Sequence, residues 1–279
     1  MLKSLYWRIH FYLKNRKSIR INKRLGNSVK AIIVESENGI LAIDPRDLEV
    51  GLKLRKEGGY GIKEINRITQ LITSKSNVLI VGAHIGSLAI PISQKCSKLV
   101  AIEANPNNFQ LLKTNIDLNQ INNIEAHNIA ASSKKEKIKF QMNTVNSGGS
   151  KRLPINNNYM YRYDNPEVIE VQAYSLDKYL PELNFDLILI DIEGSEYFAI
   201  QGMKEILSNC NKLIIEFLPH HLQNVANVSV AKLLSLIPTQ LNKITIPSKG
   251  KTYPRDIGES ILHKMYNDNQ GDDGVIFYN

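Results

Sequence analysis

Three carboxylates come directly after one apolar run, and their types and spacing suit proton transfer. Residues 187–190 are Leu-Ile-Leu-Ile, and Asp191, Glu193 and Glu196 follow within six positions. Apolar surroundings raise the pKa of a carboxylate, and a second carboxylate nearby raises it further. We therefore predict Asp191 and Glu193 as catalytic residues, of which one accepts a proton. The alternative for Asp191 is a structural role in anchoring a loop, and Glu196 is predicted to stabilise the next helix N-terminus.

A second segment combines glycines and a carboxylate in the pattern of a nucleotide-binding βαβ unit. Gly82 and Gly86 follow an apolar strand and let main chain lie close to a ligand, and a helix opening near Ser87 directs N–H groups toward it. Glu103 comes 21 positions after Gly82, near the offset at which an acid binds ribose hydroxyls. The spacing Gly-x-x-x-Gly favours a cofactor without a pyrophosphate. The alternative is an ordinary strand, turn and helix with a surface glutamate.

Strands and helices alternate along the chain as in an open α/β fold, which predicts a doubly wound, mainly parallel sheet of about seven strands. The strands are expected at 77–82, 98–103, 123–128, 138–142, 168–173, 185–191, 211–217, 241–246 and 274–278. The helices are expected at 61–74, 86–95, 106–119, 195–208 and 221–237. Ligands of such sheets bind at the carboxyl ends of the strands. Glu103, Ala104, Asn128, Asp191 and Glu216 are expected at that edge.

The N-terminal part differs from the remainder in charge. Residues 1–24 hold eight Lys and Arg and no acid, so of 35 basic residues 27 remain against 27 Asp and Glu. Residues 31–44 predict a β-hairpin that turns at Asn38-Gly39. We therefore divide the chain into a basic helix and hairpin cap, 1–57, and a main domain, 58–279.

The basic segment has three interpretations. Leu5, Tyr6, Ile9 and Tyr12 recur at helical spacing beside basic residues, as in a helix that lies on an anionic membrane. A helix docked on its own domain, or a frayed terminus, is the alternative. Nucleic-acid binding is disfavoured because no basic residues elsewhere extend the segment.

The location of the protein is predicted from its cysteines and from its hydropathy. Cys96 and Cys210 lie in apolar-patterned segments and not in a paired framework, which indicates buried thiols in a reducing compartment. No run of 18 apolar residues predicts a membrane span. A cytoplasmic protein is expected, with peripheral membrane contact through residues 1–24 as an option.

A polar segment, 143–166, is too long for an ordinary connection in a compact domain. It contains Gly148 and Gly149, and it lies between two predicted strands. Such a segment is either functional or mobile, so we interpret it as a lid over the substrate with disorder as the alternative.

The ordered motifs of residues 58–220 resemble those of FkbM-type S-adenosylmethionine (SAM)-dependent methyltransferases. The motifs are Gly59-Tyr60, Val-Gly-Ala-His-Ile-Gly at 81–86, Ala-Ile-Glu-Ala-Asn-Pro at 101–106, Asn128-Ile-Ala, Ser175-Leu-Asp, Ile190-Asp-Ile-Glu-Gly-Ser-Glu, Gln201-Gly and Ile215-Glu. The resemblance implies a class I, Rossmann-like methyltransferase fold with an antiparallel last strand. It also implies O-methylation of a hydroxyl on a sugar, glycan or other natural product, with SAM as the cofactor.

Site residues follow from the resemblance by position. Gly82, Ala83, His84 and Gly86 would wrap the methionine part of SAM, with Ser87 beside them. Glu103 would bind the ribose with Ala104 adjacent, Asn128 and Ile129 would approach the adenine, and Asp191 and Glu193 would face the transferred methyl group. No spacing here is diagnostic of a metal through Asp191, Glu193 or Glu216, and no metal is predicted.

The chain departs from the family pattern at Ile80, His84 and Leu189, where the family commonly has an acid, an Asn and a Lys. Ile80 removes a carboxylate that would order the loop or hold the SAM amino group, so weaker SAM binding is expected. Two further hypotheses therefore stand beside the active enzyme. One is a degenerate relative that binds without turnover, and the other is a membrane-surface module that acts through residues 1–24.

Overall fold

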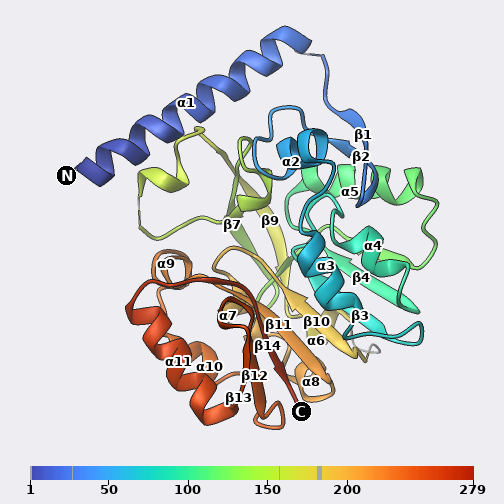
Figure 1. Cartoon of the computed structure of the whole chain (residues 1–279), viewed down its shortest axis with the longest axis vertical. Coiled ribbons are helices and arrows are strands. Elements are labelled where there is room, and N and C mark those ends of the chain that lie inside the picture. The colour runs from blue at the N-terminus through green and yellow to red at the C-terminus, as the bar shows by residue number, and fades with distance from the viewer. Residues whose placement is uncertain (1, 27, 157, 181–183) are drawn as a thin grey trace.

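The computed structural model describes residues 2–26, 28–156, 158–180 and 184–279, and a central sheet of eight strands dominates it (Figure 1). In sheet order the strands are β13 (Lys251–Pro254), β12 (Lys243–Ile246), β14 (Asp272–Tyr278), β11 (Lys212–Phe217), β10 (Leu187–Ile190), β3 (Asn77–Val81), β4 (Lys98–Ile102) and β5 (Ile124–His127). The strands from β11 to β5 are parallel. The strand β14 is antiparallel to β11, and β12 is antiparallel to β14. The α/β prediction is confirmed. With the edge strand β13 the sheet has eight strands, against the predicted number of about seven.

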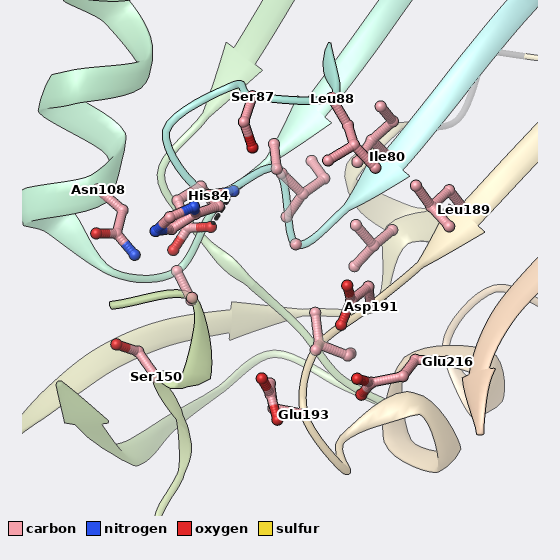
Figure 2. Close-up of a pocket in the computed structure, with 18 of the residues that line it drawn as sticks. Ile80, His84, Ser87, Leu88, Asn108, Ser150, Leu189, Asp191, Glu193 and Glu216 are labelled. Atoms are coloured by element: carbon pink, nitrogen blue, oxygen red, sulfur yellow. Dashed lines mark hydrogen bonds between the residues drawn. The ribbon is translucent and has the colours of Figure 1, made fainter. Parts of the chain in front are cut away.

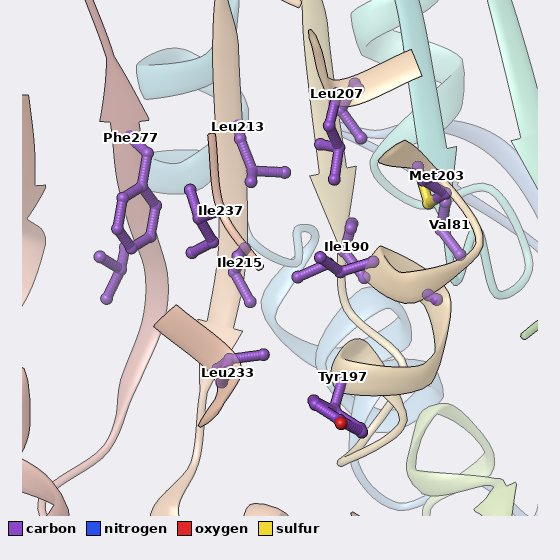
Figure 3. Close-up of a cluster of buried hydrophobic side chains, with 14 of the residues drawn as sticks. Val81, Ile190, Tyr197, Met203, Leu207, Leu213, Ile215, Leu233, Ile237 and Phe277 are labelled. Atoms are coloured by element: carbon purple, nitrogen blue, oxygen red, sulfur yellow. The ribbon is translucent and has the colours of Figure 1, made fainter. Parts of the chain in front are cut away.

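Helices cover both faces of this sheet because alternate strand residues point to opposite sides. On one face Val78 and Ile80 pack toward α3 (Ile62–Thr69), α4 (Ala89–Ser93) and α5 (Pro106–Leu118). On the other face, Leu79 and Val81 join the core beneath α7 (Glu196–Gln201), α8 (Lys204–Ser208), α10 (Val230–Leu234) and α11 (Arg255–Asn267) (Figure 3). Cys96 and Cys210 are buried, unpaired thiols in these two layers, as predicted.

Two predicted helices are interrupted. The helix expected at 195–208 divides into α7 and α8 at Gly202, where a Cβ atom would lie 2.0 Å from the Ser132 carbonyl oxygen. The helix expected at 221–237 becomes α9 (Pro219–His221), a π-helical turn at Leu222–Ala226 and α10, with Asn227 left-handed at φ 55°. The helix expected at 86–95 is the short α4, which begins after the left-handed Gly86.

A second, four-stranded sheet lies beside the first, and the polar segment 143–166 belongs to it. It consists of β6 (Ala130–Ala131), β9 (Glu167–Tyr174), β7 (Glu136–Met142) and β8 (Lys151–Arg152), with a 3₁₀ turn at Ser147–Gly149 before β8 and another at Tyr159–Tyr161 after it. The Asp164 carboxylate accepts hydrogen bonds from the backbone N–H groups of Thr144 and Val145, at 2.8 and 3.0 Å. The described residues of 143–166 are therefore folded, and disorder is wrong for them.

The predicted hairpin is present as β1 (Ile32–Ser36) and β2 (Gly39–Ile43), and α2 (Val50–Glu57) follows it. One short helix, α6 (Leu176–Tyr179), lies between β9 and β10 in the chain. Asn115 on α5 is fully buried and holds this hairpin. Its side chain accepts from the Ala42 N–H at 2.6 Å and donates to the Ile85 carbonyl at 2.8 Å. The N-terminal part thus packs closely on the main domain. The division of the chain at residue 57 stays a prediction.

The N-terminal helix α1 (Leu2–Leu25) runs along the edge of the molecule beside the segment between β7 and β9 (Figure 1). Phe11 stacks on Tyr163 with ring centroids 4.5 Å apart, the Asn15 amide donates to the Tyr163 carbonyl, and the Ser18 hydroxyl donates to the Arg46 carbonyl. Residue 1 of the predicted basic segment lies outside the described residues. Within the described residues, the structure contains no helix with the length and apolarity needed to span a bilayer.

Candidate functional site

A cavity of about 570 Å³ lies at the carboxyl ends of four central strands (Figure 2). Gly82, Glu103, Asp191 and Glu216 line it from the ends of β3, β4, β10 and β11. Residues of segment 143–166 and the start of α2 also line it, so this segment covers the strand ends as the lid prediction requires. The cavity size falls in the range of small-molecule sites.

The structure brings together most of the predicted site residues. The predicted residues that line the cavity are Gly82, Ala83, His84, Ser87, Glu103, Ala104, Ile129, Asp191 and Glu193. Gly86 and Asn128 do not line it. The Asn128 amide donates instead to the Glu103 carbonyl at 2.8 Å and supports the end of β4.

The two glycines of the loop are needed by the packing of the protein itself. A Cβ atom at Gly82 would lie 1.8 Å from the Asp191 carbonyl oxygen, and one at Gly86 would lie 2.8 Å from Leu112 Cδ1. Both glycines have left-handed φ angles, +97° and +87°. The N–H groups of Gly82 and Ala83 both donate to the Ile102 carbonyl at 2.9 Å, so they are not free for a ligand. Gly82 therefore brings the loop against Asp191 after β10, and Gly86 brings it against α5.

Glu103 holds the loop and faces the cavity at the same time. One carboxylate oxygen accepts the His84 N–H and the other the Asn105 N–H, each at 2.7 Å. The Asn108 side chain is a third donor to this carboxylate, which leaves one of its four acceptor positions for a ligand hydroxyl. Burial raises the pKa of Glu103 to about 7, although the hydrogen bonds from both N–H groups lower it.

His84 connects the glycine loop to the segment that covers the cavity. Its Nε2 lies 2.7 Å from the Ser147 hydroxyl, and that hydroxyl donates a short hydrogen bond to the Asp47 carboxylate. Because Ser147 donates to Asp47, it accepts from Nε2–H of His84, which fixes the tautomer. Burial lowers the pKa of His84 to about 4, so the ring is neutral. Sequence reasoning missed Asp47 and Ser147, which lie far from the motifs in the chain.

Asp191 lines the cavity with a carboxylate that the hydrogen bonds of its own loop leave unoccupied. Among the described residues, none donates a hydrogen bond to its side chain, whereas Glu196 accepts from the N–H groups of Ile192 and Gly194 at 3.1 Å. Burial and the charge of Glu193 raise the pKa of Asp191 well above its usual value. Glu196 therefore shapes the loop, as its predicted structural role suggests, and Asp191 is open to a substrate.

Two further side chains, which sequence reasoning also missed, contact Glu193. The Lys151 ammonium lies 3.3 Å from Glu193 Oε2, and His221 Nδ1 lies 3.0 Å from the same oxygen. Lys151 comes from β8 and His221 from α9. In the sequence, Lys151 follows Gly148 and Gly149 of the predicted lid, and His221 follows the predicted strand 211–217. These positions are the only features of the sequence that point to a role for Lys151 and His221 in the site. The distance that joins them to Glu193 depends on tertiary packing.

Ile80 and Leu189 form an apolar part of the cavity wall. They are register partners on the adjacent strands β3 and β10, and both are 2% exposed. Both line the cavity, on the two strands that lead to the glycine loop and to Asp191 (Figure 2). Two of the three departures from the family pattern are thus neighbours in space.

The family model for the FkbM methyltransferase domain matches residues 81–243, which is more than half of the chain. The chain belongs to the FkbM methyltransferase family. The match includes all four strand ends that line the cavity, and it leaves out α1 and the hairpin. No curated protein matches the sequence.

Solved structures similar to this FkbM family member are distant. Methyltransferase FkbM from Methylobacillus flagellatus KT is 18% identical, with a TM-score of 0.43 over 74% of this chain and 44% of that chain. Trm5b from Pyrococcus abyssi is 13% identical, with a TM-score of 0.44 over 91% and 57%. TYW2 of M. jannaschii, in complex with AdoMet, is 16% identical, with a TM-score of 0.39 over 67% and 62%. The chain spans about half the length of the first two proteins.

SAM is the cofactor of this family, and the cavity residues fit it. Glu103 offers a free acceptor position for a ribose hydroxyl, and Ala104 and Ile129 also line the cavity with apolar surface. Asp191 and Glu193 place negative charge toward the other end, which suits the positive sulfonium. When bound, SAM supplies a methyl group on a positively charged sulfur.

Proposed function

We propose that this FkbM family member is an active SAM-dependent O-methyltransferase whose acceptor is a hydroxyl of a sugar, glycan or other natural product. The observation that carries the proposal is Asp191, a cavity-lining carboxylate to which no described residue donates a hydrogen bond. A hydroxyl must lose its proton when its oxygen bonds to the methyl carbon, and a carboxylate within reach can accept it.

We infer a division of roles among the residues of the cavity. Gly82, Ala83 and His84 would hold the methionine part of SAM, Glu103 the ribose, and Ile129 the adenine, with Gly86, Ser87, Ala104 and Asn128 supporting these contacts. Asp191 would take the hydroxyl proton as the bond from sulfur to the methyl carbon breaks. Glu193 would orient the acceptor beside Asp191.

The cofactor half of the proposal is tested by calorimetric titration with SAM, its demethylated product S-adenosylhomocysteine (SAH), and NADH. We expect SAM and SAH to bind and NADH not to bind. Glu103→Ala should weaken SAH binding by at least about tenfold, because it removes the acceptor of the ribose hydroxyls. Tight NADH binding, or unchanged SAH affinity in the variant, would contradict the assignment of the cavity.

The catalytic half is tested by SAH release with a panel of hydroxyl acceptors and a transfer RNA arm. Asp191→Asn should bind SAH with unchanged affinity and release at least about a hundredfold less product, because amide nitrogen cannot accept the proton. Binding without release for every acceptor would favour the degenerate relative instead. Methylation confined to RNA would overturn the proposed acceptor class.

We also propose that α1 brings the enzyme to anionic membrane surfaces, which would supply a lipid-linked or surface-bound acceptor. The docked face of α1 carries Phe11, Asn15 and Ser18, whereas the apolar residues of the predicted membrane face remain exposed. Those exposed residues are Leu5, Tyr6, Ile9, Tyr12 and Leu13, whereas Trp7 stacks on Phe11 beside the docked face. Docking and membrane contact therefore use different faces of the helix.

A further inference from the structure

Three side chains at the acceptor end of the cavity have the donor types and spacing of a metal site. Glu193 follows β10, Glu216 lies on β11, and His221 ends α9. Their ligand atoms all lie within 4.8 Å of one another. Figure 2 shows the carboxylates of Glu193 and Glu216 on the same side of the cavity as Asp191.

The imidazole of His221 is the independent observation that points to a ligand. The side chain is 7% exposed, and Nδ1 has no hydrogen-bond partner among the described residues. Nδ1 nevertheless lies 3.0 Å from Glu193 Oε2 and 3.9 Å from Glu216 Oε2, too poorly directed for a hydrogen bond. A buried polar atom without a partner is costly, and a cation between the three groups would satisfy it.

The loop after β10 is packed so that this arrangement cannot easily open. Glu193 and Gly194 have left-handed φ angles of 58° and 98°. A Cβ atom at Gly194 would lie 2.9 Å from the His221 Cβ and 2.8 Å from the Val225 Cβ. The glycine thus lets the loop approach α9 closely, and this approach brings Glu193 to His221.

The local charge also favours a cation. Asp191, Glu193 and Glu216 line the same cavity, and Lys151 contacts this group through Glu193 at 3.3 Å. One ammonium faces three carboxylates, and close carboxylates with too little positive charge among them repel one another. A divalent ion would relieve that repulsion.

We propose that Glu193, Glu216 and His221 bind a divalent first-row transition-metal ion such as Mn²⁺. Two carboxylates and one imidazole suit such an ion better than Mg²⁺, which prefers oxygen ligands alone. Three protein ligands leave open coordination positions, and Glu193 and Glu216 present them to the cavity. There the ion can bind the acceptor hydroxyl and ease the loss of its proton to Asp191.

The test is a titration of the full chain, stripped of metal with EDTA, with Mn²⁺ followed by the electron paramagnetic resonance signal of free Mn²⁺. We expect about one site per chain, and displacement by Zn²⁺ as the stability order of divalent ions requires. Glu216→Gln and His221→Gln should each weaken Mn²⁺ binding by at least about tenfold. His220→Gln, at the neighbouring position in sequence, is the matched control and should leave it unchanged.

The Mn²⁺ titration does not require methyl transfer, so it tests the metal site independently of the proposed enzymatic activity. Glu103→Gln should lower the affinity for SAH and leave the affinity for Mn²⁺ unchanged. Glu216→Gln should lower the affinity for Mn²⁺ and leave the affinity for SAH unchanged. Thermal unfolding of each variant checks that it is folded. The proposal is overturned if the protein does not lower the concentration of free Mn²⁺ at any total Mn²⁺ concentration up to about 1 mM. It is also overturned if the folded Glu216 and His221 variants bind Mn²⁺ as well as the unaltered chain.

Discussion

Glu103 has two roles, one in holding the glycine loop and one at the wall of the cavity, and the sequence motif predicts only the second. It fixes the glycine loop through the His84 N–H and also faces the cavity. In the proposed role of Glu103, its carboxylate accepts from the ribose, and protonation removes acceptor capacity, so it should weaken cofactor binding. The binding of SAH should therefore report the pKa of this group.

We predict that SAH affinity rises with pH and levels off above about 7, because burial raises the pKa of Glu103 to about 7. Below that pH, protonation competes with binding, and affinity should fall by up to about tenfold per pH unit. The measurement is calorimetric titration between about pH 6 and 8. Glu103→Gln is the control, since it binds more weakly but with no such slope. A constant affinity in the unaltered chain would show that Glu103 does not contact the ligand.

His84 shows why one departure from the family pattern is tolerated. Its φ angle is +52°, in the left-handed region where Asn, Asp and His are the non-glycine residues found most often. Replacing the family's Asn by His keeps a residue that accepts this conformation. The imidazole adds the contact with Ser147 that links the loop to the segment above it.

At the scale of elements, the departures from the family pattern at Ile80 and Leu189 affect one pair of neighbouring side chains and can be treated as a single change. The family's acid and Lys would lie at register partners on β3 and β10, where this chain has an apolar pair. An ion pair replaced as a unit by apolar residues is often neutral or stabilising. The departures therefore do not by themselves indicate a degenerate enzyme.

A double-mutant cycle on these strands tests that interpretation. Ile80→Asp alone should lower the free energy of unfolding by about 3–5 kcal/mol, because it buries an unpaired charge. Adding Leu189→Lys should recover part of the loss, with a coupling energy of about 0.5–3 kcal/mol. Urea unfolding of the four proteins gives both numbers. Additive losses would mean that the two side chains do not interact.

The break between α7 and α8 gives a second prediction at this scale. Gly202→Ala places a Cβ atom 2.0 Å from the Ser132 carbonyl, so something in the main chain must move. We expect a loss of at least about 2 kcal/mol in the free energy of unfolding. Gly148→Ala is the matched control, because its Cβ atom would meet neighbours only at 3.7 Å or more. Equal losses in the two variants would refute the steric explanation.

The order of elements could be predicted from the sequence, and their interruptions could not. Apolar strands and the Pro106 helix start are local signals, and β3, β4, β10 and α5 lie within the predicted ranges. The helix α11 lies in the 247–273 segment, where sequence reasoning expected no element. The Arg255 guanidinium at its start donates to the Pro238 and Ile237 carbonyls, a contact that only the fold provides.

The site follows the same division. Glu103, Asp191 and Glu193 were predictable because the carboxyl ends of parallel strands meet at one edge. Lys151, His221 and Asp47 come from the second sheet, from α9 and from the segment before α2, whose positions depend on long-range packing. Their residue types carried no signal until these segments met at the cavity.

At the scale of the whole molecule, the charge is concentrated in α1. Residues 1–24 carry all of the excess of +8, and the remainder is balanced. Tyr6 and Leu13 are 64% and 60% exposed on this helix. A basic helix with free aromatic and aliphatic side chains is suited to an anionic lipid surface.

We predict that the chain sediments with vesicles that contain phosphatidylserine and less so with neutral vesicles or at high salt. The double variant Tyr6→Ser, Leu13→Ser should reduce the partition coefficient by about tenfold or more, since each side chain buries apolar surface on binding. Ile33→Ser is the control, because Ile33 is 64% exposed on β1, away from α1. Equal effects of both substitutions, or no sedimentation, would exclude α1 as the contact.

The apolar wall made by Ile80 and Leu189 has a consequence for which acceptors can enter. Hydrocarbon side chains hold no water and polarise weakly, so the local permittivity beside Asp191 is low and the field of the carboxylates is poorly screened. Before a cation binds there, a phosphorylated or carboxylated molecule would be repelled from this end of the cavity. An uncharged polyol would pass without that barrier.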